Sequence, residues 1–171
     1  ARHLKVRHLE VGLDPVFDAL RGVLPPGPPL AVANLKPRLR AVTWYYFAAS
    51  YGYLVLGAGN RSEIEVGYFT KYGDGAVDLL PLGDLLKTEI YALARALRLP
   101  RWLLAKPPSA GLWAGQTDEL EMGVTYEDLD RFLAAPEGSG VAAEVRDLIL
   151  RLRRTSEHKR CAVPVFRRPK P

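Results

Sequence analysis

The chain has 171 residues, of which 48% are apolar and 25% charged, a composition that suits one folded domain with a hydrophobic core. No run approaches the roughly 20 apolar residues of a membrane span, no charged-then-apolar leader opens the chain, and the single cysteine, Cys161, excludes an internal disulfide, so we expect a cytoplasmic protein that does not bind membranes. The formal net charge of +5 favours anionic partners, either nucleic acid or phosphorylated small molecules.

The first third of the chain reads as an alternation of strands and helices. One helix is predicted from Asp14 to Leu24, because Asp14 and Pro15 fit an N-cap and a first helical position. A long helix is predicted from Asn34, its expected cap, to about Tyr51. Short apolar or alternating runs predict three strands, at residues 4–11, 30–33 and 53–57.

The rest of the chain predicts helices separated by irregular segments. Helices are expected from about Asn60, over residues 86–97, from Thr125 to Leu133, and over residues 141–152. Residues 70–84 and 106–122 are irregular, and the second of these is long enough to be a binding loop or lid. The tail from Thr155 is expected to be extended and basic. Strand–helix alternation predicts an α/β fold, a parallel sheet with helices on both faces and a ligand site beyond the carboxyl ends of the strands.

Two predicted helices begin with cations, which the helix dipole disfavours. Lys36, Arg38 and Arg40 crowd the start of the long helix, and Lys87 lies in the first turn of a later one. An anionic ligand would remove the conflict in both helices. Side chains that point into water would remove it equally well.

Residues 57–63 follow a predicted strand and open a helix, but they fail the dinucleotide fingerprint because Ser62 stands where a glycine is required. Glu63 lies three residues after Asn60, which is the spacing of a capping box, and spacing alone favours that role over a metal role. The run from Trp44 to Phe47 is apolar on every side of its helix, which predicts burial in a core and against a partner subunit.

Other polar residues give weaker signals. Lys71 and Asp78 flank a glycine turn and read as solvated loop charges. His158 has no cysteine or histidine partner at metal spacing, so a zinc site is not expected. Ser109 has no neighbouring histidine, so a hydrolase triad has no support.

Seven segments occur in an order and sequence that closely resemble the NAD synthetases of the N-type ATP pyrophosphatase superfamily. The run Tyr68-Phe-Thr-Lys-Tyr-Gly-Asp-Gly75 is highly specific. The resemblance covers nearly the whole chain, through residues 34–40, 57–63, 67–75, 78–82, 106–110, 115–119 and 157–160.

The resemblance implies a ligase that makes NAD from deamido-NAD, ATP and ammonia. ATP would first adenylate the nicotinic acid carboxylate and release pyrophosphate, and ammonia would then displace AMP, with Mg²⁺ neutralising the phosphates. The implied fold is a three-layer α/β/α, Rossmann-like domain of the adenine nucleotide α-hydrolase-like type, with residues 1–171 forming a single domain. The implied assembly is a homodimer.

The resemblance also assigns site residues. Deamido-NAD would contact Arg38, Lys71, Asp78, His158 and Lys159. ATP would contact Lys87, Ser109 and the position of Ala58. Glu63 would bind magnesium, which overturns the preference for its capping role. It would serve both roles only if its side chain swings off the cap.

Three departures from the family pattern weaken parts of this assignment. Ala58 stands where the family usually has threonine, and Gly111 stands where it commonly has aspartate. The Ser-Gly-Gly-x-Asp-Ser loop that grips pyrophosphate is not found in these residues, so the domain is expected to lack its first strand–helix unit. We therefore expect residues 1–171 on their own to make no NAD.

Three other hypotheses remain. An inactive relative that binds dinucleotide as a sensor or scaffold is favoured by the three departures and opposed by Glu63, Lys71, Asp78 and Lys87. Another ATP pyrophosphatase, such as the amidating enzyme of GMP synthesis, does not account for the Tyr68–Gly75 run. A nucleic-acid-binding domain rests on charge alone, and we expect no such partner.

Overall fold

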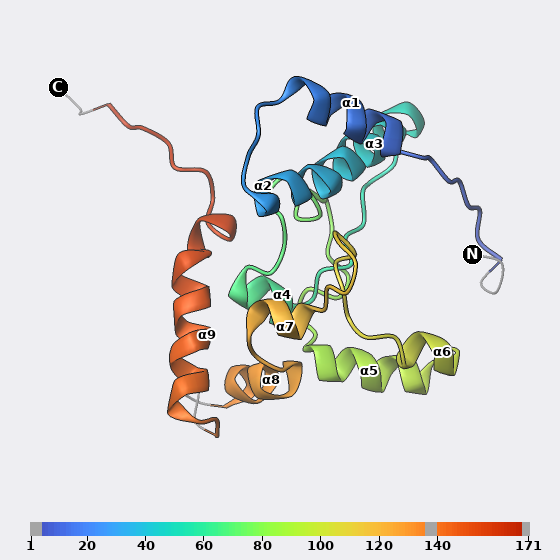
Figure 1. Ribbon diagram of the computed structural model, residues 1–171. Coiled ribbons are helices and arrows are strands. Elements are labelled where there is room, and N and C mark those ends of the chain that lie inside the picture. The colour runs from blue at the N-terminus through green and yellow to red at the C-terminus, as the bar shows by residue number, and fades with distance from the viewer. Residues whose placement is uncertain (1–4, 136–139, 169–171) are drawn as a thin grey trace.

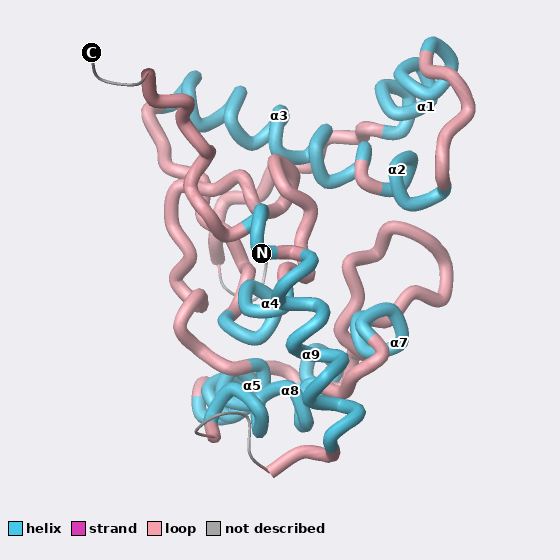
Figure 2. The backbone as a smooth tube through the Cα atoms, turned by 90° about the vertical axis from the view of Figure 1, so that its left-hand side faces the viewer, coloured by secondary structure: helices cyan, strands magenta, loops and turns pink. Residues whose placement is uncertain are grey.

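The computed structural model describes residues 5–135 and 140–168, and helices dominate both ranges (Figure 1). Two views show the helices in two groups joined by irregular segments (Figures 1 and 2). The first group comprises α1 (Asp14–Val23), α2 (Pro29–Ala33) and α3 (Leu35–Tyr51). The second comprises α4 (Arg61–Val66), α5 (Lys87–Ala96), α6 (Arg101–Leu104), α7 (Asp118–Met122), α8 (Tyr126–Ala134), α9 (Ala143–Thr155) and the 3-10 turn η2 (Glu157–Lys159).

The prediction of a parallel sheet is wrong for the described residues, which form no strand. One isolated parallel bridge joins Leu56 to Leu79, at the place of the third predicted strand. Residues 5–11 are exposed and unpaired with any ladder, and residues 30–33 lie in α2. A strand is stable only where a neighbour takes its backbone groups, and residues 53–57 find such a partner only at positions 78 and 79.

Helix α2 replaces a predicted strand for a local reason. Pro29 occupies one of its first positions, where a fixed φ and a missing N–H suit a helix start. The run from Leu30 to Ala33 carries too few residues for its apolar character to distinguish a strand from a helix.

The long helix α3 matches its predicted bounds but not its predicted cap. Asn34 stands at the N-cap position with helical φ and ψ, and its side chain makes no capping bond. Instead its Oδ1 accepts a hydrogen bond from the Thr70 hydroxyl at 2.6 Å. The helix ends at Gly52, whose φ of 65° is the left-handed conformation of a common helix end.

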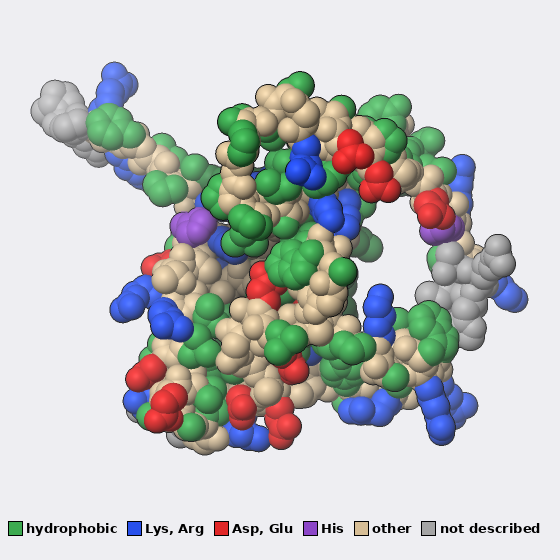
Figure 3. Space-filling view, in the orientation of Figure 1, with side chains coloured by type: hydrophobic (Ala, Val, Ile, Leu, Met, Phe, Trp, Pro, Cys, Tyr) green, Lys and Arg blue, Asp and Glu red, His purple; other side chains and the backbone are tan. Residues whose placement is uncertain are grey.

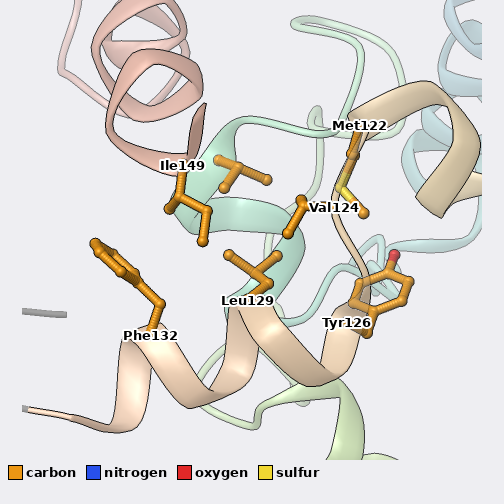
Figure 4. Close-up of a cluster of buried hydrophobic side chains, with 7 residues drawn as sticks. Met122, Val124, Tyr126, Leu129, Phe132 and Ile149 are labelled. Carbon is orange, nitrogen blue, oxygen red and sulfur yellow. The ribbon is translucent and has the colours of Figure 1, made fainter. Parts of the chain in front are cut away.

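The core of the second group is a small apolar cluster formed by α4, α7, α8 and α9 (Figure 4). Leu129 and Ile149 have no exposed surface. Tyr126 lies at one side of the cluster and turns a hydroxyl group toward polar neighbours. The buried members are Val66, Met122, Val124, Tyr126, Leu129, Phe132 and Ile149.

The surface view shows how charges are distributed on one face (Figure 3). Acidic side chains lie around α8 and α9 and also around α1, and basic ones are spread over several elements rather than over one patch. In the described part of the chain, no helix has the length and hydrophobicity needed to cross a membrane.

Candidate functional site

The short helix α4 begins in the capping box that its sequence predicts. The Asn60 side chain accepts the Glu63 backbone N–H at 3.0 Å, and Glu63 Oε2 accepts the Asn60 backbone N–H at 3.1 Å. The two residues thus satisfy backbone donors reciprocally at the helix start. This geometry fixes the direction in which the Glu63 carboxylate leaves the helix.

The other Glu63 oxygen faces Lys87, at the start of α5. Lys87 Nζ lies 2.9 Å from Glu63 Oε1, and each of the two side chains is 17% exposed. The ammonium also lies 4.7 Å from the centre of the Tyr126 ring. Lys87 is therefore neither fully solvated nor isolated, because a carboxylate and an aromatic face both stabilise its charge.

Tyr126 connects this pair to a second carboxyl group. Its hydroxyl lies 3.2 Å from Glu63 Oε1 and 2.9 Å from Asp118 Oδ2. The single phenolic proton is either shared between the two acceptors or complemented by a proton on a carboxyl group. Burial raises the pKa of Asp118, which favours its protonated form, although the hydrogen bond with Tyr126 opposes the shift. Within the described ranges, Asp118 Oδ1 is buried without a hydrogen-bond partner.

A second group of cations lies at the other end of α4. Lys71 Nζ donates to the His158 carbonyl at 2.5 Å, and Arg38 donates to the Lys71 carbonyl at 3.4 Å. Lys159 Nζ donates to the carbonyls of Gly67 and Phe69 at 2.6 and 2.7 Å. Burial lowers the pKa of Lys159 from its usual value. The structure thus brings Arg38, Lys71, the His158 backbone and Lys159 to the end of α4, and their contacts with deamido-NAD stay a prediction of the resemblance.

The tail reaches this position because residues after α9 form hydrogen bonds with the end of α4, an arrangement of Ser156, Lys159 and Arg160 that we call the clasp. The buried Ser156 hydroxyl donates to the Val66 carbonyl at 2.9 Å, and Arg160 Nη1 donates to Ser156 Oγ at 2.7 Å. Gly67, with φ of 67°, allows the close approach, because a Cβ there would lie 2.2 Å from the Ser156 Cβ. The prediction of an extended tail is therefore wrong for residues 157–159, which form η2.

A pocket of about 310 Å³ opens beside this cation group. Its walls come from α2 and α3, the segment after α4, the loop before α7 with α7 itself, and Lys159 of η2, so distant parts of the chain build it. Arg40, Trp44, Phe69 and Lys159 contribute basic and aromatic surface, and Asp74 and Glu121 contribute acidic groups. Basic and aromatic side chains together suit an anionic ligand that carries flat rings.

Three predicted site residues are not joined to these groups by any described contact. Asp78 accepts hydrogen bonds from the Tyr45 hydroxyl at 3.1 Å and the Val55 N–H at 2.8 Å. Tyr45 is seven residues after Arg38, about 10 Å along α3. Ser109 is exposed and accepts the Gly111 N–H at 3.1 Å. Ala58 is exposed in the segment before α4.

The carboxylates as arranged do not fit a magnesium ion. Both Glu63 oxygens already accept hydrogen bonds, one from the cap and one from Lys87. Over residues 5–135 and 140–168, no group of three histidine, cysteine, aspartate or glutamate side chains is placed to hold a metal. Magnesium demands near-octahedral oxygen ligands, and one engaged carboxylate does not supply them.

Sequence reasoning missed several residues that build the site. These residues are Asp118, Tyr126 and Asp130. The partners of Tyr126 and Asp130 on α4 and α5 lie 42 to 68 positions away, and Asp118 accepts a hydrogen bond from Tyr126 only because α7 and α8 pack together. A signal did exist for two of them. Tyr126 and Asp130 are four apart on a predicted helix, so they had to share one face.

Comparison with known proteins gives consistent results. The family model described as NAD synthase matches residues 1–163. An "NH(3)-dependent NAD(+) synthetase" of Carboxydothermus hydrogenoformans is 53% identical over 165 residues, which are 94% of this chain and 67% of that protein. The protein of the same name from Archaeoglobus fulgidus is 52% identical over 82% of this chain and 58% of its own length.

Solved structures show the same relationship. NMN synthetase from Francisella tularensis superposes with a TM-score of 0.89 at 38% identity, over 96% of this chain and 68% of that one. NAD⁺ synthetase from Burkholderia pseudomallei gives a TM-score of 0.66 at 33% identity, over 88% and 58%. The chain spans between about half and two thirds of the length of the curated relatives it matches.

Proposed function

The chain belongs to the NAD synthase family and shares its fold, and from this we propose that the protein carrying it converts deamido-NAD to NAD with ATP and ammonia. The carboxylate of the nicotinic acid ring would attack the α-phosphorus of ATP, and the bond to the departing pyrophosphate would break. The nitrogen of ammonia would then attack the acyl carbon, release AMP and lose a proton. The product is a primary amide.

The observation that carries this proposal is the placement of charged groups at the two ends of α4. Lys87 and Glu63 lie at its start, and Lys71 and Lys159 lie at its end. A helix of six residues is about 9 Å long, a distance that a bound nucleotide can span. We assign ATP to the Lys87 end, together with Ser109 and the Ala58 position, and the dinucleotide to the other end and the pocket beside it.

The magnesium site at Glu63 and the assignment of Arg38 and Asp78 to deamido-NAD stay predictions of the resemblance. Glu63 would hold an ion only after leaving Lys87 and the cap. Arg38 reaches the dinucleotide end through the Lys71 carbonyl. Asp78 would have to exchange the Tyr45 hydroxyl for a ligand group.

An assay of the whole protein tests the proposed reaction. We expect AMP, pyrophosphate and NAD to form in equal amounts when ATP, ammonia and deamido-NAD are all present, because one adenylation precedes each amide. Omitting ammonia should stop AMP release but leave exchange of labelled pyrophosphate into ATP. No exchange and no AMP with any acceptor would show an inactive relative that binds dinucleotide as a sensor or scaffold.

A mononucleotide is the second candidate substrate, because a similar structure is named an NMN synthetase. Running the assay in parallel with nicotinic acid mononucleotide separates the two. Preference for deamido-NAD in kcat/KM supports the dinucleotide. Preference for the mononucleotide would replace it with the shorter substrate and leave the ATP chemistry intact.

Replacing Lys71 with alanine should weaken the binding of deamido-NAD more than the binding of ATP. The change removes a charge-assisted contact, which costs about 1.5–3 kcal/mol of binding free energy, and it frees the His158 carbonyl. Calorimetric titration of each ligand measures the difference. Lys5→Ala, an exposed lysine near the other end of the chain, is the control. Equal deamido-NAD affinity in the Lys71 and Lys5 variants would remove Lys71 from the site.

The aromatic surface of α3 supports the homodimer that the sequence predicts. Tyr46 is 67% exposed and Tyr51 58% exposed. Phe47 stacks on Tyr51 with ring centres 6.2 Å apart, and Tyr51 lies 5.7 Å from Tyr53. A contiguous exposed aromatic surface is typical of an interface. We propose that a second copy covers it.

Sedimentation equilibrium tests that assembly. At micromolar concentration we expect a dimer, and Tyr46→Glu should shift it toward monomer by at least tenfold in Kd, because a charge would be buried in the interface. Trp102→Glu, a change of another exposed aromatic residue on α6, is the matched control. A monomer in the unaltered protein contradicts the proposal.

A further inference from the structure

The start of α5 is held by side chains that come from outside its own first turn. Its N-cap residue is Leu86, whose side chain cannot accept a hydrogen bond. The Lys87 N–H instead donates to the Ser62 hydroxyl at 2.9 Å, and the Thr88 N–H donates to Asp130 Oδ2 at 2.7 Å. Ser62 belongs to α4 and Asp130 to α8, so two other helices fix the position of this one.

Asp130 joins the three helices at a single buried point. Its second oxygen, Oδ1, accepts a hydrogen bond from the Ser62 hydroxyl. Asp130 is 4% exposed and Ser62 is fully buried. Leaving a buried polar group unpaired is costly, so these bonds hold the relative positions of α4, α5 and α8 closely. The carboxylate also places negative charge at the start of α5, where the dipole favours it.

Tyr126 acts one turn earlier on the same face of α8. Its hydroxyl touches Glu63 Oε1, and its ring lies against the Lys87 ammonium. Tyr126 and Asp130 are four residues apart and therefore share one side of the helix. One face of α8 thus contacts both members of the Glu63–Lys87 pair through Tyr126, and through Asp130 it binds Ser62 and Thr88, the neighbours of that pair in the chain.

These bonds also limit how a phosphate can be bound here. The N–H groups of Leu86, Lys87 and Thr88 are all engaged, by Glu89, Ser62 and Asp130. The start of α5 therefore offers none of these three backbone donors to an anion. The Lys87 side chain supplies the cation that can bind phosphate here, and its direction depends on how the helix start is held.

We propose that Asp130 and Tyr126 are positioning residues of the ATP site, which hold Lys87 and Glu63 in place through the packing of α8 on α4 and α5. The proposal rests on the assignment of Lys87 to ATP in the proposed function. It adds two residues that touch no ligand and act through the charged pair. It also makes α8 the element that sets the ATP end independently of the dinucleotide end.

The test compares ATP and deamido-NAD binding to variants of the whole protein. Asp130→Asn keeps the shape but removes an acceptor, and we expect ATP affinity to fall about tenfold while deamido-NAD affinity changes less than twofold. Glu127→Gln removes an exposed carboxylate on the same helix and should change neither. Equal losses for both ligands would show that α8 is only a structural support and would overturn the proposal.

A double-mutant cycle separates this proposal from the proposed function. If Asp130 acts through Lys87, the double variant Lys87→Ala/Asp130→Asn should bind ATP no more weakly than Lys87→Ala alone. If the double variant loses ATP affinity by the product of the two single losses, the positioning role is overturned. An unchanged ATP affinity in Lys87→Ala would instead overturn the assignment of Lys87 to ATP. If Asp130→Asn does not fold, Tyr126→Phe decides by the same criteria. This variant keeps the ring, and its expected loss of ATP affinity is about fivefold.

Discussion

Replacing Lys87 with alanine should lower kcat/KM for ATP by about a hundredfold to a thousandfold, the cost typical of removing one preorganised group that stabilises developing charge. Lys87 is the cation at the start of α5, and its backbone is fixed by Ser62 and its side chain by Glu63 and Tyr126. Alanine removes the charge and leaves the direction of the helix unchanged. A steady-state assay with ATP as the varied substrate measures the effect.

The same change should also destabilise the fold. Glu63 would lose its partner in a half-buried site, at a cost of about 1.5–3 kcal/mol in the free energy of unfolding. Arg131→Ala is the matched control, because Arg131 pairs with Glu127 and Asp128 at the surface, where an ion pair contributes roughly 0–1 kcal/mol. Activity within threefold of the unaltered protein would remove Lys87 from the chemistry.

Gly67→Ala is expected to be the most destabilising single methyl addition among the glycines of this site. Two costs add, since a left-handed φ disfavours any Cβ by about 1–2 kcal/mol and overpacking costs about 1–3 kcal/mol more. The new methyl would lie 2.2 Å from the Cβ and 2.4 Å from the Oγ of Ser156. Urea denaturation should therefore show a loss of about 2–5 kcal/mol.

Gly52→Ala separates the two costs. Gly52 ends α3 with φ of 65°, almost the same conformation, but a Cβ there meets no described atom within 4 Å. Only the conformational cost of about 1–2 kcal/mol applies. Similar losses at both positions would mean that α9 and η2 shift without cost, and that the clasp between Ser156 and α4 is loose.

The sequence predicted those parts of the fold that depend on neighbours in the chain. Asn60 and Glu63 form the expected capping box, and Thr125 caps α8, because both devices need only three residues of spacing. The bounds of α3 and α5 are also close to prediction. The prediction of a strand at residues 30–33 was wrong because a four-residue apolar run is too short to show a periodicity. The proline at the start of α2 favours a helix there.

The site was predictable only where a motif named it. Lys87 at the start of α5 stands out because it opposes a helix dipole, whereas Lys71 and Lys159 at the end of α4 are assigned to a ligand only by the resemblance. Their partners were not predicted, because Asp130 reaches Thr88 across 42 positions and Ser62 across 68. No local rule links such residues. The conflict at Lys87, which two hypotheses explained by ligand or water, is relieved in the structure by carboxylates of the protein itself.

The clasp on α4 also bears on the order in which the chain acquires its structure. Ser156, Lys159 and Arg160 bond to carbonyls that lie 90 to 96 positions earlier, and contacts of such long separation form late because the loop between them must first close. A helix of six residues does not persist alone in water. During synthesis, therefore, α4 leaves the ribosome long before the residues that hold its end. Lys87 at its start and the cations at its end reach their final relative positions only after position 160 has been made.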